Sequence, residues 1–326
     1  MMQDSFNGQN PNTFSAPSVA VLLATYNGAK YIKEQLESIA CQTYQDFICF
    51  IHDDGSSDDT VNIVKAFCET HSGHFNFVGT HKVYGAKNNF IYLLSHVTAP
   101  YIMFSDQDDV WLPEKVEVSM KKMKMTERLR GGAILVYSNV KVVDADLNEG
   151  LPPYYGESRN PSSNSVRDLL SGNVCLGHTM LMNQELREHI LNVENWDNIH
   201  MHDWWAAIVG AAFGSMIYIE QPLALYRQHT NNTVGLGKKK LSDRVRHFET
   251  LQNIKVWWKL QNEIRDESRL YAKELARIIP REHADYDLIK QFSTIGTNCK
   301  LNRMLFYVRN HLFLTYRPIL VQILFV

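Results

Sequence analysis

The most informative segment of the sequence reads Tyr101-Ile102-Met103-Phe104-Ser105-Asp106-Gln107-Asp108-Asp109-Val110-Trp111. Its first four residues are apolar and predict a short buried strand, so the three aspartates follow at the carboxyl end of that strand. In an open α/β sheet, ligands bind in the crevice outside the carboxyl ends of the strands. Carboxylates this close together remain ionised only if a cation or several donors face them. The segment therefore indicates a ligand site, with a solvated acidic turn as the alternative interpretation.

The residue types in this segment indicate which cation would bind. Carboxylates with no Cys or His among them are hard oxygen ligands, which suit Mg²⁺ or Mn²⁺. These ions commonly bridge a protein carboxylate to a diphosphate. We therefore expect a Mg²⁺ or Mn²⁺ site that serves a phosphorylated ligand.

Strands and helices alternate on both sides of this segment. Apolar runs predict strands at residues 19–24, 47–51, 75–78 and 101–104. Apolar residues at helical spacing predict a helix after each of these strands. This alternation predicts a parallel, doubly wound α/β sheet with right-handed crossovers. Because no GxGxxG follows the first strand and the chain has no P-loop, the sequence excludes a dinucleotide-binding fold and a P-loop enzyme.

The pattern becomes less regular after residue 132. Strands are predicted at residues 133–137 and 140–143, and a loop is predicted at about residues 148–165. Helical and strand pieces are then mixed up to about residue 235, and we expect an acceptor substrate to bind in this half. Beyond it, the sequence has helical patterning with many charges.

Charge is distributed unevenly along the 326 residues. Residues 1–237 carry 16 basic and 26 acidic side chains, whereas residues 238–326 carry 17 basic and 9 acidic ones. The basic C-terminal region is expected to meet an anionic surface, and a membrane fits better than a nucleic acid. A helical tail docked on the acidic body is the alternative. No run of 18 apolar residues is present, so we expect no transmembrane helix.

Cysteines and the first residues indicate the compartment. The five cysteines are odd in number and lack CxxC spacing, which favours reduced thiols in the cytoplasm over disulfides or a zinc site. Residues 1–16 are polar, lack the regions of a signal peptide and are predicted to be disordered.

Three segments together resemble a known family. They are Ala24-Thr25-Tyr26-Asn27-Gly28, Asp53-Asp54-Gly55-Ser56-Ser57-Asp58-Asp59-Thr60, and the acidic segment from Ser105 to Trp111. Their order and spacing resemble the GT-A glycosyltransferases of glycosyltransferase family 2, which are inverting enzymes that use nucleotide-diphosphate sugars. The acidic segment, followed later by His202-Asp203-Trp204, is similar to bacterial rhamnosyltransferases of cell-surface polysaccharide assembly.

The resemblance implies an architecture. We expect a Rossmann-like α/β domain of the GT-A type at residues 17–235, with a mostly parallel central sheet flanked by helices. Residues 236–326 would form a helical C-terminal extension associated with a membrane or a partner. Membrane contact would be peripheral, at the inner face of the cell membrane.

The resemblance also implies the nucleotide-sugar site. Asp54 would accept the N3–H of uracil or thymine, and because both bases present this group, it would not distinguish UDP from dTDP. The base and ribose pocket would be lined by Thr25, Tyr26 and Asn27. Lys87 would reach the donor phosphate or sugar, although a solvated lysine at the start of a helix is the alternative.

Within the acidic segment, the family motif assigns Asp108 as the direct metal ligand. Asp106 would contact the ribose or sugar, and Asp109 would hold donor sugar hydroxyls or ligate through water. His229 would complete the metal shell, and Arg227 would meet the diphosphate, since its planar fork suits two oxygens.

An inverting transfer needs a base that takes the proton of the acceptor hydroxyl. We predict that Asp203 is this base, because it opens a predicted helix at residues 203–212 and has apolar neighbours that would raise its pKa. A helix N-cap is the alternative role. The family usually places the base in an acidic pair, and here His202 precedes it, so the role of that neighbour stays open. Asn173 and residues 177–179 lie where the family's acceptor loop would be.

These expectations combine into one function. The chain would transfer a single sugar, since it lacks the Gln-x-x-Arg-Trp motif and the transmembrane helices of the processive members of the family. The expected donor is dTDP-L-rhamnose and the acceptor a saccharide, which a lipid would carry if the tail meets a membrane. The alternatives are a UDP-hexose transferase, a nucleotide-sugar hydrolase and a non-catalytic nucleotide-sugar binding module.

Overall fold

A mixed sheet of eight strands forms the centre of the molecule, in the order β3-β2-β1-β4-β7-β6-β8-β5. The computed structural model describes residues 17–155, 160–162, 164–229 and 251–312, with the backbone alone for 251–261. The strands are β1 (Val19–Thr25), β2 (Phe47–Asp53), β3 (Phe75–Thr80), β4 (Tyr101–Ser105), β5 (Val110–Trp111), β6 (Ala133–Val143), β7 (Met180–Asn183) and β8 (Gly214–Arg227).

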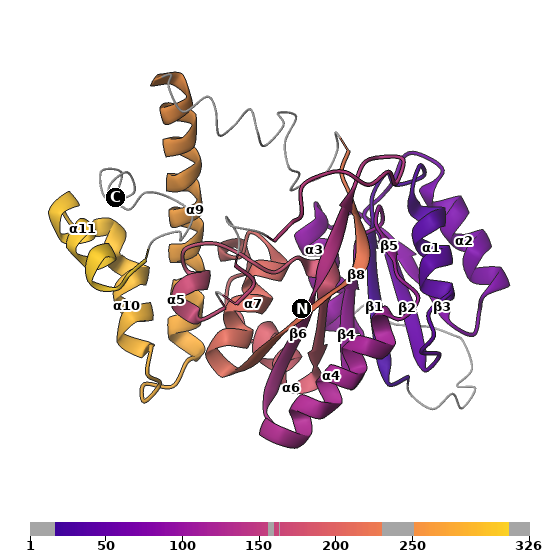
Figure 1. The fold of residues 1–326 in the computed structure, drawn as a ribbon, viewed down its shortest axis with the longest axis horizontal. Helices are drawn as coiled ribbons and strands as arrows, with labels where there is room; N and C mark the ends of the chain where they lie inside the picture. The colour runs from indigo at the N-terminus through magenta and orange to yellow at the C-terminus, as the bar shows by residue number, and fades with distance from the viewer. Residues whose placement is uncertain (1–16, 156–159, 163, 230–250, 313–326) are drawn as a thin grey trace.

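Helices cover both faces of this sheet (Figure 1). The α-helices are α1 (Ile32–Ala40), α2 (Thr60–Thr70), α3 (Ala86–His96), α4 (Lys115–Arg130), α5 (Val166–Leu169), α6 (Gln184–Leu191), α7 (His202–Phe213), α9 (Leu251–Ile278), α10 (Tyr286–Thr294) and α11 (Lys300–Arg309). Short 3₁₀ turns are η1 (Gly177–Thr179), η2 (Trp196–Asn198) and η3 (Ile295–Thr297).

The first half of the sheet has the predicted parallel arrangement. β1 is parallel to β2 and to β4, and β2 is parallel to β3. Every residue of β1 is buried, and successive side chains enter different cores. Val19, Val21 and Leu23 pack with α1, α2 and α4, whereas Ala20 and Leu22 pack with α3, α6 and α7. A strand covered on both faces reads as a continuous apolar run, which is why the sequence predicted it.

The second half of the sheet departs from the doubly wound prediction. β7 is antiparallel to both β4 and β6, and β5 is antiparallel to β8, so the sheet is mixed. The two strands predicted at residues 133–137 and 140–143 form the single strand β6. Its pairing with β8 shifts register between Ser138 and Lys141, where Pro222 lies opposite Asn139. The polar break in the apolar run therefore marks an irregularity within one strand, and the prediction of two strands was wrong.

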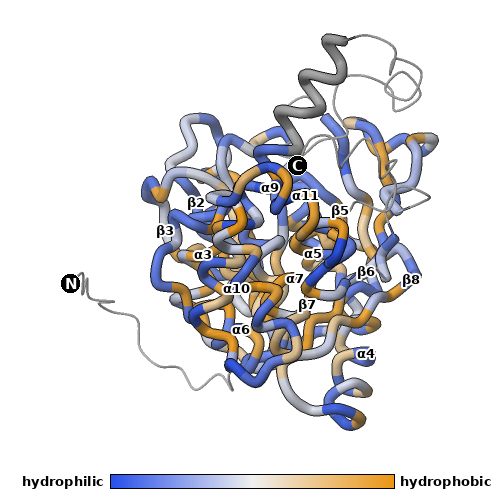
Figure 2. Tube along the Cα trace, turned by 90° about the vertical axis from the view of Figure 1, so that its left-hand side faces the viewer, coloured by the Kyte–Doolittle hydropathy of each residue, from blue (hydrophilic) through white to orange (hydrophobic). Residues whose placement is uncertain are grey.

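Helix patterning was predicted well where the helix is amphipathic. Val116, Met120 and Met123 form the buried face of α4, as predicted. Along α4 the residues alternate between hydrophobic and hydrophilic, as Figure 2 shows. In α2 the predicted inner face is only partly buried, because Val64 is buried while Phe67 and Cys68 are half-buried.

The C-terminal helices pack on the body at the end of the molecule that carries α5 and α7 (Figure 1). Tyr271, Ala272 and Leu275 of α9 are fully buried and belong to the same core as α7. The Tyr271 hydroxyl accepts a hydrogen bond from the Met201 N–H at 2.9 Å, directly before α7. Among the helices that the structure describes, none combines the length and apolar character needed to cross a bilayer.

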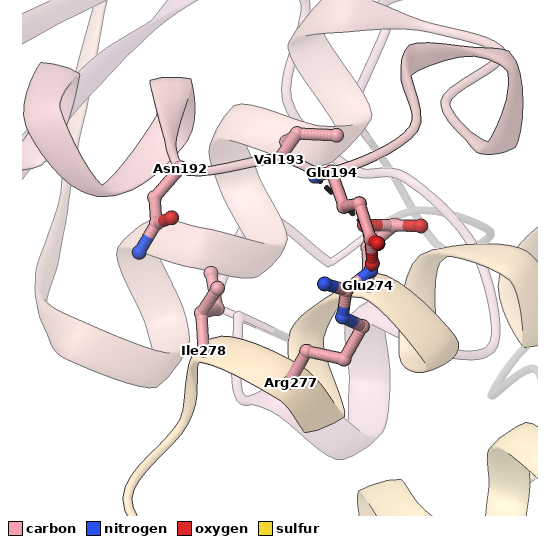
Figure 3. A pocket seen from close by; sticks show the side chains of 6 residues that line it. All are labelled: Asn192, Val193, Glu194, Glu274, Arg277 and Ile278. Carbon is pink, nitrogen blue, oxygen red and sulfur yellow. Dashed lines mark hydrogen bonds and ion pairs between the residues drawn. The ribbon is translucent and has the colours of Figure 1, made fainter.

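A pocket of about 320 Å³ lies where α9 meets the segment after α6 (Figure 3). It is lined by Asn192, Val193, Glu194, Glu274, Arg277 and Ile278. Arg277 of α9 pairs with Glu194, and the buried Glu274 carboxylate accepts from the N–H of Glu194 at 3.2 Å. None of the predicted site residues lines this pocket.

Two predictions lie outside the described residues. These are the disorder of residues 1–16 and the boundary near residue 235, which falls within residues 230–250.

Gly214, at the junction of α7 and β8, gives a test of the packing. A Cβ at this position would lie 1.9 Å from the carbonyl oxygen of Ala133, which is backbone and cannot move aside. We expect Gly214→Ala to lower the free energy of unfolding by about 3 kcal/mol. Gly73→Ala is the matched control, because a Cβ there meets nothing within 4 Å. Urea denaturation measures both, and equal effects of the two substitutions would contradict this account of the junction.

Candidate active site

The ends of three parallel strands bring the sequence segments of the site together. In the register of the sheet, Thr25 at the end of β1 lies opposite Asp53 at the end of β2. On its other side, Leu23 of β1 lies opposite Ser105 at the end of β4. The loops that follow these strands therefore leave the sheet at one edge, where ligands of open α/β sheets bind.

Hydrogen bonds lock the first two loops to each other. The Thr25 hydroxyl donates to the Asp53 carboxylate at 3.0 Å. The Asn27 side chain accepts the N–H of Ser57 at 2.9 Å, and the Asn27 N–H donates to the Ser56 hydroxyl at 2.8 Å. Asn27 has a φ of 47°, in the left-handed region that Asn tolerates better than most residues. The polar groups of Thr25 and Asn27 thus shape the loop, while the Tyr26 side chain is 55% exposed beside it.

Asp54 is buried and holds a third loop. Its carboxylate accepts backbone N–H groups from Val83, from Tyr84 at 2.9 Å and from Gly85 at 2.6 Å. These residues directly precede α3. The predicted contact of Asp54 with a pyrimidine base stays a prediction, and the structure adds a role in positioning the loop.

Gln107 ties the acidic segment to the end of β1. Its side-chain amide donates to the Tyr26 carbonyl and accepts from the Tyr26 N–H, both at 2.9 Å. Gly28 leaves the space for this amide, since a Cβ on Gly28 would lie 2.2 Å from the Gln107 Oε1. Glycine at position 28 is therefore needed for Gln107 to hold the Tyr26 backbone.

The acidic segment faces His178 of η1. Nδ1 of His178 lies 3.2 Å from an Asp106 oxygen and 3.0 Å from Asp109 Oδ2. Burial alone would lower the pKa of His178, but the charges and hydrogen bonds of Asp109 and Asp106 raise it to about 9. His178 is therefore protonated at neutral pH and balances part of the negative charge. The ligand atoms of Asp106, Asp109 and His178 lie within 4.8 Å of one another, a spacing that would also suit a metal ion.

Lys115 is a second buried basic residue at the site. Its side chain has no exposed surface, and its ammonium donates to the His178 carbonyl at 2.8 Å. It also lies 4.7 Å from the centre of the Trp111 ring. Burial lowers the pKa of Lys115 to about 7, while Asp109 and Asp106 act in the opposite direction. Trp111 is buried beneath this lysine and packs in the core, so the structure gives it no exposed stacking face.

Asp108 pairs with His229 at the mouth of the site. The Asp108 Oδ2 and the His229 Nε2 are 2.8 Å apart, and the two side chains are 19% and 11% exposed. Burial, followed by the charges of Asp109 and Asp106, raises the pKa of Asp108 to about 8. Burial and the charge of Arg227 lower the pKa of His229. A neutral imidazole beside a carboxylate is the form in which these two residues could bind a cation.

Arg227 is buried behind this pair. Its guanidinium donates to the Asp108 carbonyl and to the Ala145 carbonyl, both at 2.7 Å, and pairs with Glu34. Its backbone N–H donates to the Asp109 carboxylate at 3.0 Å. With 2% of the residue exposed, this arrangement favours a role in positioning Asp108 and His229 over direct contact with a diphosphate.

Asp203 lies at the start of α7, beside η1. Its carboxylate faces the N–H of Gly177, and the charge of Asp106 acts on it. Burial raises the pKa of Asp203 to about 7. Gly177 admits this approach, because a Cβ there would lie 3.2 Å from the Asp203 Cβ and 2.9 Å from the His202 Nε2. Adjacent residues of η1 thus contact the predicted base and the acidic segment.

His202 and Lys87 complete the predicted region. The His202 ring stacks on Phe90 at 4.1 Å, burial lowers its pKa to about 4, and neither ring nitrogen has a partner within the described part of the chain. The Lys87 ammonium donates to the Trp196 carbonyl of η2 at 3.0 Å. Its reach toward a donor phosphate stays a prediction. Asn173 bonds within its own loop, to the backbone of Cys175.

Sequence reasoning missed several residues that shape the site. Lys115 and Gln107 were not predicted to contribute, and His178 was placed only in an acceptor loop. A lysine following the acidic segment and opening an amphipathic helix reads as solvated, and only the packed structure shows that it is buried. Gly28 and Gly177 lie in segments that the sequence analysis named, but their close contacts with Gln107, His202 and Asp203 were not predicted.

The sequence is similar to those of several known proteins. A family model described as Glycosyl transferase family 2 matches residues 20–191. The chain is 31% identical over 223 residues to the dTDP-rhamnosyl transferase RfbG of Shigella flexneri, covering 65% of this chain and 73% of RfbG. It is 30% identical over 145 residues to the putative glycosyltransferase EpsE of Bacillus subtilis (strain 168), covering 42% of this chain and 50% of EpsE.

Solved structures show the same fold. The crystal structure of S. aureus TarS 1-349 in complex with UDP-GlcNAc aligns with a TM-score of 0.54 and 15% identity, covering 88% of this chain and 72% of that chain. Another crystal structure of S. aureus TarS 1-349 aligns with a TM-score of 0.53 and 15% identity, covering 90% of this chain and 80% of that chain. These alignments confirm the expected GT-A fold with its helical C-terminal region.

The contact between Gly28 and Gln107 can be tested with a double-mutant cycle. Gly28→Ala should displace the Gln107 amide from the Tyr26 backbone and lower the free energy of unfolding by about 1–2 kcal/mol, the value of two hydrogen bonds. In a Gln107→Ala background the same substitution should have little further effect, because the amide is already absent. Urea denaturation of the four proteins measures the coupling. Strictly additive effects would show that the two residues do not depend on each other.

Proposed function

This chain belongs to glycosyl transferase family 2, and on that premise we propose that it transfers a single sugar from a nucleotide-diphosphate donor to a hydroxyl of a saccharide acceptor. We propose L-rhamnose as the sugar and dTDP-L-rhamnose as the donor. This choice is supported by the name of RfbG, a dTDP-rhamnosyl transferase of which this chain matches 73% of the length. A UDP-hexose is the second candidate, because a carboxylate at Asp54 accepts the same N3–H from uracil and thymine.

One observation carries the proposal. Gly177 and His178 are neighbours in η1, and they contact Asp203 and the carboxylates of Asp106 and Asp109, respectively. One short turn, η1, thereby contacts both the predicted base of α7 and the predicted donor site after β4. A transferase needs this arrangement, because the acceptor oxygen must attack the sugar carbon in line with the departing diphosphate.

Asp203 has the properties of a general base. Its pKa of about 7 leaves a large ionised fraction at neutral pH while giving the carboxylate more basicity than an exposed aspartate has. In the proposed step the acceptor hydroxyl gives its proton to Asp203, its oxygen bonds to the sugar carbon, and the bond from that carbon to the diphosphate breaks. The ionisable groups around Asp203 are Asp106, His178 and Cys175, with Tyr271 on α9 and His202 beside it in the chain.

Asp108 and His229 fit a divalent cation best. Their ligand atoms are 2.8 Å apart and both side chains retain exposed surface, so an ion between them could also reach a bound diphosphate. Asp109 and His178 are each 1% exposed, so an ion held by them would be farther from solvent and from a diphosphate. Either site must give up a proton, from Asp108 in the first and from His178 in the second. We propose that Mg²⁺ or Mn²⁺ binds at Asp108 and His229. When bound, the ion would stabilise the negative charge of the departing diphosphate.

The remaining predicted residues surround the donor. We propose that the exposed Tyr26 side chain contacts the base or ribose, and that Asp54 and the loop it holds, Val83–Gly85, lie beside the base. Asp106, whose side chain is 40% exposed, would contact the ribose or the sugar. Thr25, Asn27, Asp109 and Arg227 would act by fixing the loops that carry these groups.

Replacing the proposed base should separate binding from turnover. In Asp203→Asn the amide keeps the shape of the side chain but cannot accept a proton, so we expect kcat to fall by about 10²–10⁴-fold. Donor affinity should stay the same, because Asp203 faces the acceptor side. Product formation from dTDP-rhamnose and dTDP titration by calorimetry measure the two quantities.

The control for this substitution is Asp287→Asn, which changes an exposed aspartate on α10. It should retain the parental rate. Turnover of Asp203→Asn at the parental rate would disprove the assignment of the base. Release of dTDP at equal rates with and without a saccharide acceptor would favour the hydrolase alternative.

Removing the proposed metal ligand Asp108 should abolish the metal dependence of donor binding. We expect Asp108→Ala to bind dTDP equally with and without Mn²⁺, since a single ligand, His229, would hold the ion only weakly. Calorimetry with Mn²⁺ and after EDTA treatment measures the difference. If the variant kept the Mn²⁺ dependence of the parental protein, the ion would bind elsewhere, with Asp106, Asp109 and His178 as the next candidate site.

A further inference from the structure

Helix α11 presents an apolar stripe to solvent. Leu301, Leu305 and Val308 are 59%, 55% and 42% exposed. Their spacing of four and then three residues places them on one side of the helix. Large exposed apolar side chains in a contiguous stripe commonly mark an interaction surface.

The inner side of α11 fixes this orientation. Tyr307 is buried, and its ring lies 5.9 Å from that of Phe292 in α10. The guanidinium of Arg265 in α9 lies 5.4 Å from the centre of the Tyr307 ring. Phe306 also packs on Phe292, with ring centroids 6.4 Å apart. The helix is therefore docked through one side, and the opposite side is held facing outward.

The charge around the stripe identifies what would cover it. From Leu288 to Val326 the sequence contains no acidic residue, and its basic residues are Lys290, Lys300, Arg303, Arg309 and Arg317. Three of these five belong to α11 itself. A helix that combines an apolar stripe with basic flanks has the composition of helices that lie in the interface of an anionic bilayer.

A second helix allows the choice to be tested. α4 also exposes two apolar side chains, Met125 and Leu129, at 52% and 72%. It carries Glu117 and Glu127 among its basic residues. The absence of acids from the C-terminal segment, together with its longer stripe, favours α11 over α4 as the surface for an anionic partner.

We propose that the outward face of α11 docks on an anionic phospholipid surface, with Leu301, Leu305 and Val308 entering the boundary between headgroups and acyl chains. The exposed Lys300 and Arg309 contact the phosphate groups, whereas Arg303 lies on the docked side with Tyr307. This contact is independent of the sugar transferred. Both predictions for the C-terminal region would then hold, because its inner side packs on the body and its outer side meets the membrane.

Sedimentation with vesicles of phosphatidylcholine, with and without phosphatidylglycerol, tests this proposal on the full chain without any nucleotide sugar. We expect binding to the anionic vesicles that weakens as salt is raised. The double substitution Leu301→Glu and Leu305→Glu should lower the partition coefficient by about tenfold or more, since each Leu removed from the interface corresponds to at least that factor. The matched variant, Met125→Glu with Leu129→Glu, should bind like the parental protein.

Thermal unfolding checks that both variants fold, as expected for substitutions of exposed residues. The proposal is overturned if the parental chain does not bind anionic vesicles, if the α11 variant binds as well as the parental protein, or if only the α4 variant loses binding. Concentration-dependent self-association that is lost in the α11 variant, without vesicle binding, would assign the stripe to a second copy of the chain instead. Because no donor is present, these outcomes do not depend on the proposed transfer reaction.

Discussion

Repulsion among the carboxylates after β4 is the constraint around which this site is built. Burial raises the pKa of Asp108, and the nearby charges of Asp109 and Asp106 raise it further. The protein offsets this charge with His178, with the buried ammonium of Lys115, and with the backbone N–H of Arg227. These groups face Asp106 and Asp109 from the inside, whereas Asp108, beside His229, has its pKa raised to about 8 and keeps its proton at neutral pH until a cation displaces it.

His178, which offsets the charge of these carboxylates, also connects distant parts of the chain. His178 lies in η1, whose first residue, Gly177, contacts Asp203. Asp203 opens α7, and the segment before α7 is held by α9 through the hydrogen bond of Tyr271 to Met201 and through the Glu274 carboxylate. The C-terminal helices therefore support the part of the chain that carries the proposed base. Any effect of the membrane contact proposed for α11 on the site would pass through these packed helices.

The sequence predicted those features that follow from a regular pattern. Continuous apolar runs marked β1, β2 and β4 because strands buried on both faces leave no polar positions. The acids after β4 and the family segments located the site. The single strand β6 was missed because Ser138 and Asn139 interrupt its apolar run, although Ser138 is 1% exposed. The burial of Lys115 and Arg227 was also missed, because a charged side chain reads as solvated until its partners, which come from distant residues, are known. The antiparallel β7 could not be predicted from a four-residue run.

In the proposed enzyme, a divalent ion at Asp108 and His229 and the base Asp203 serve one cavity. A crystal structure with Mn²⁺ and dTDP, with the ion located by its anomalous scattering, tests this most directly. We expect one ion at Asp108 and His229 that also contacts the diphosphate, with the Asp203 carboxylate facing the same cavity. An ion enclosed by Asp106, Asp109 and His178, or a diphosphate separated from Asp203 by protein, would contradict it.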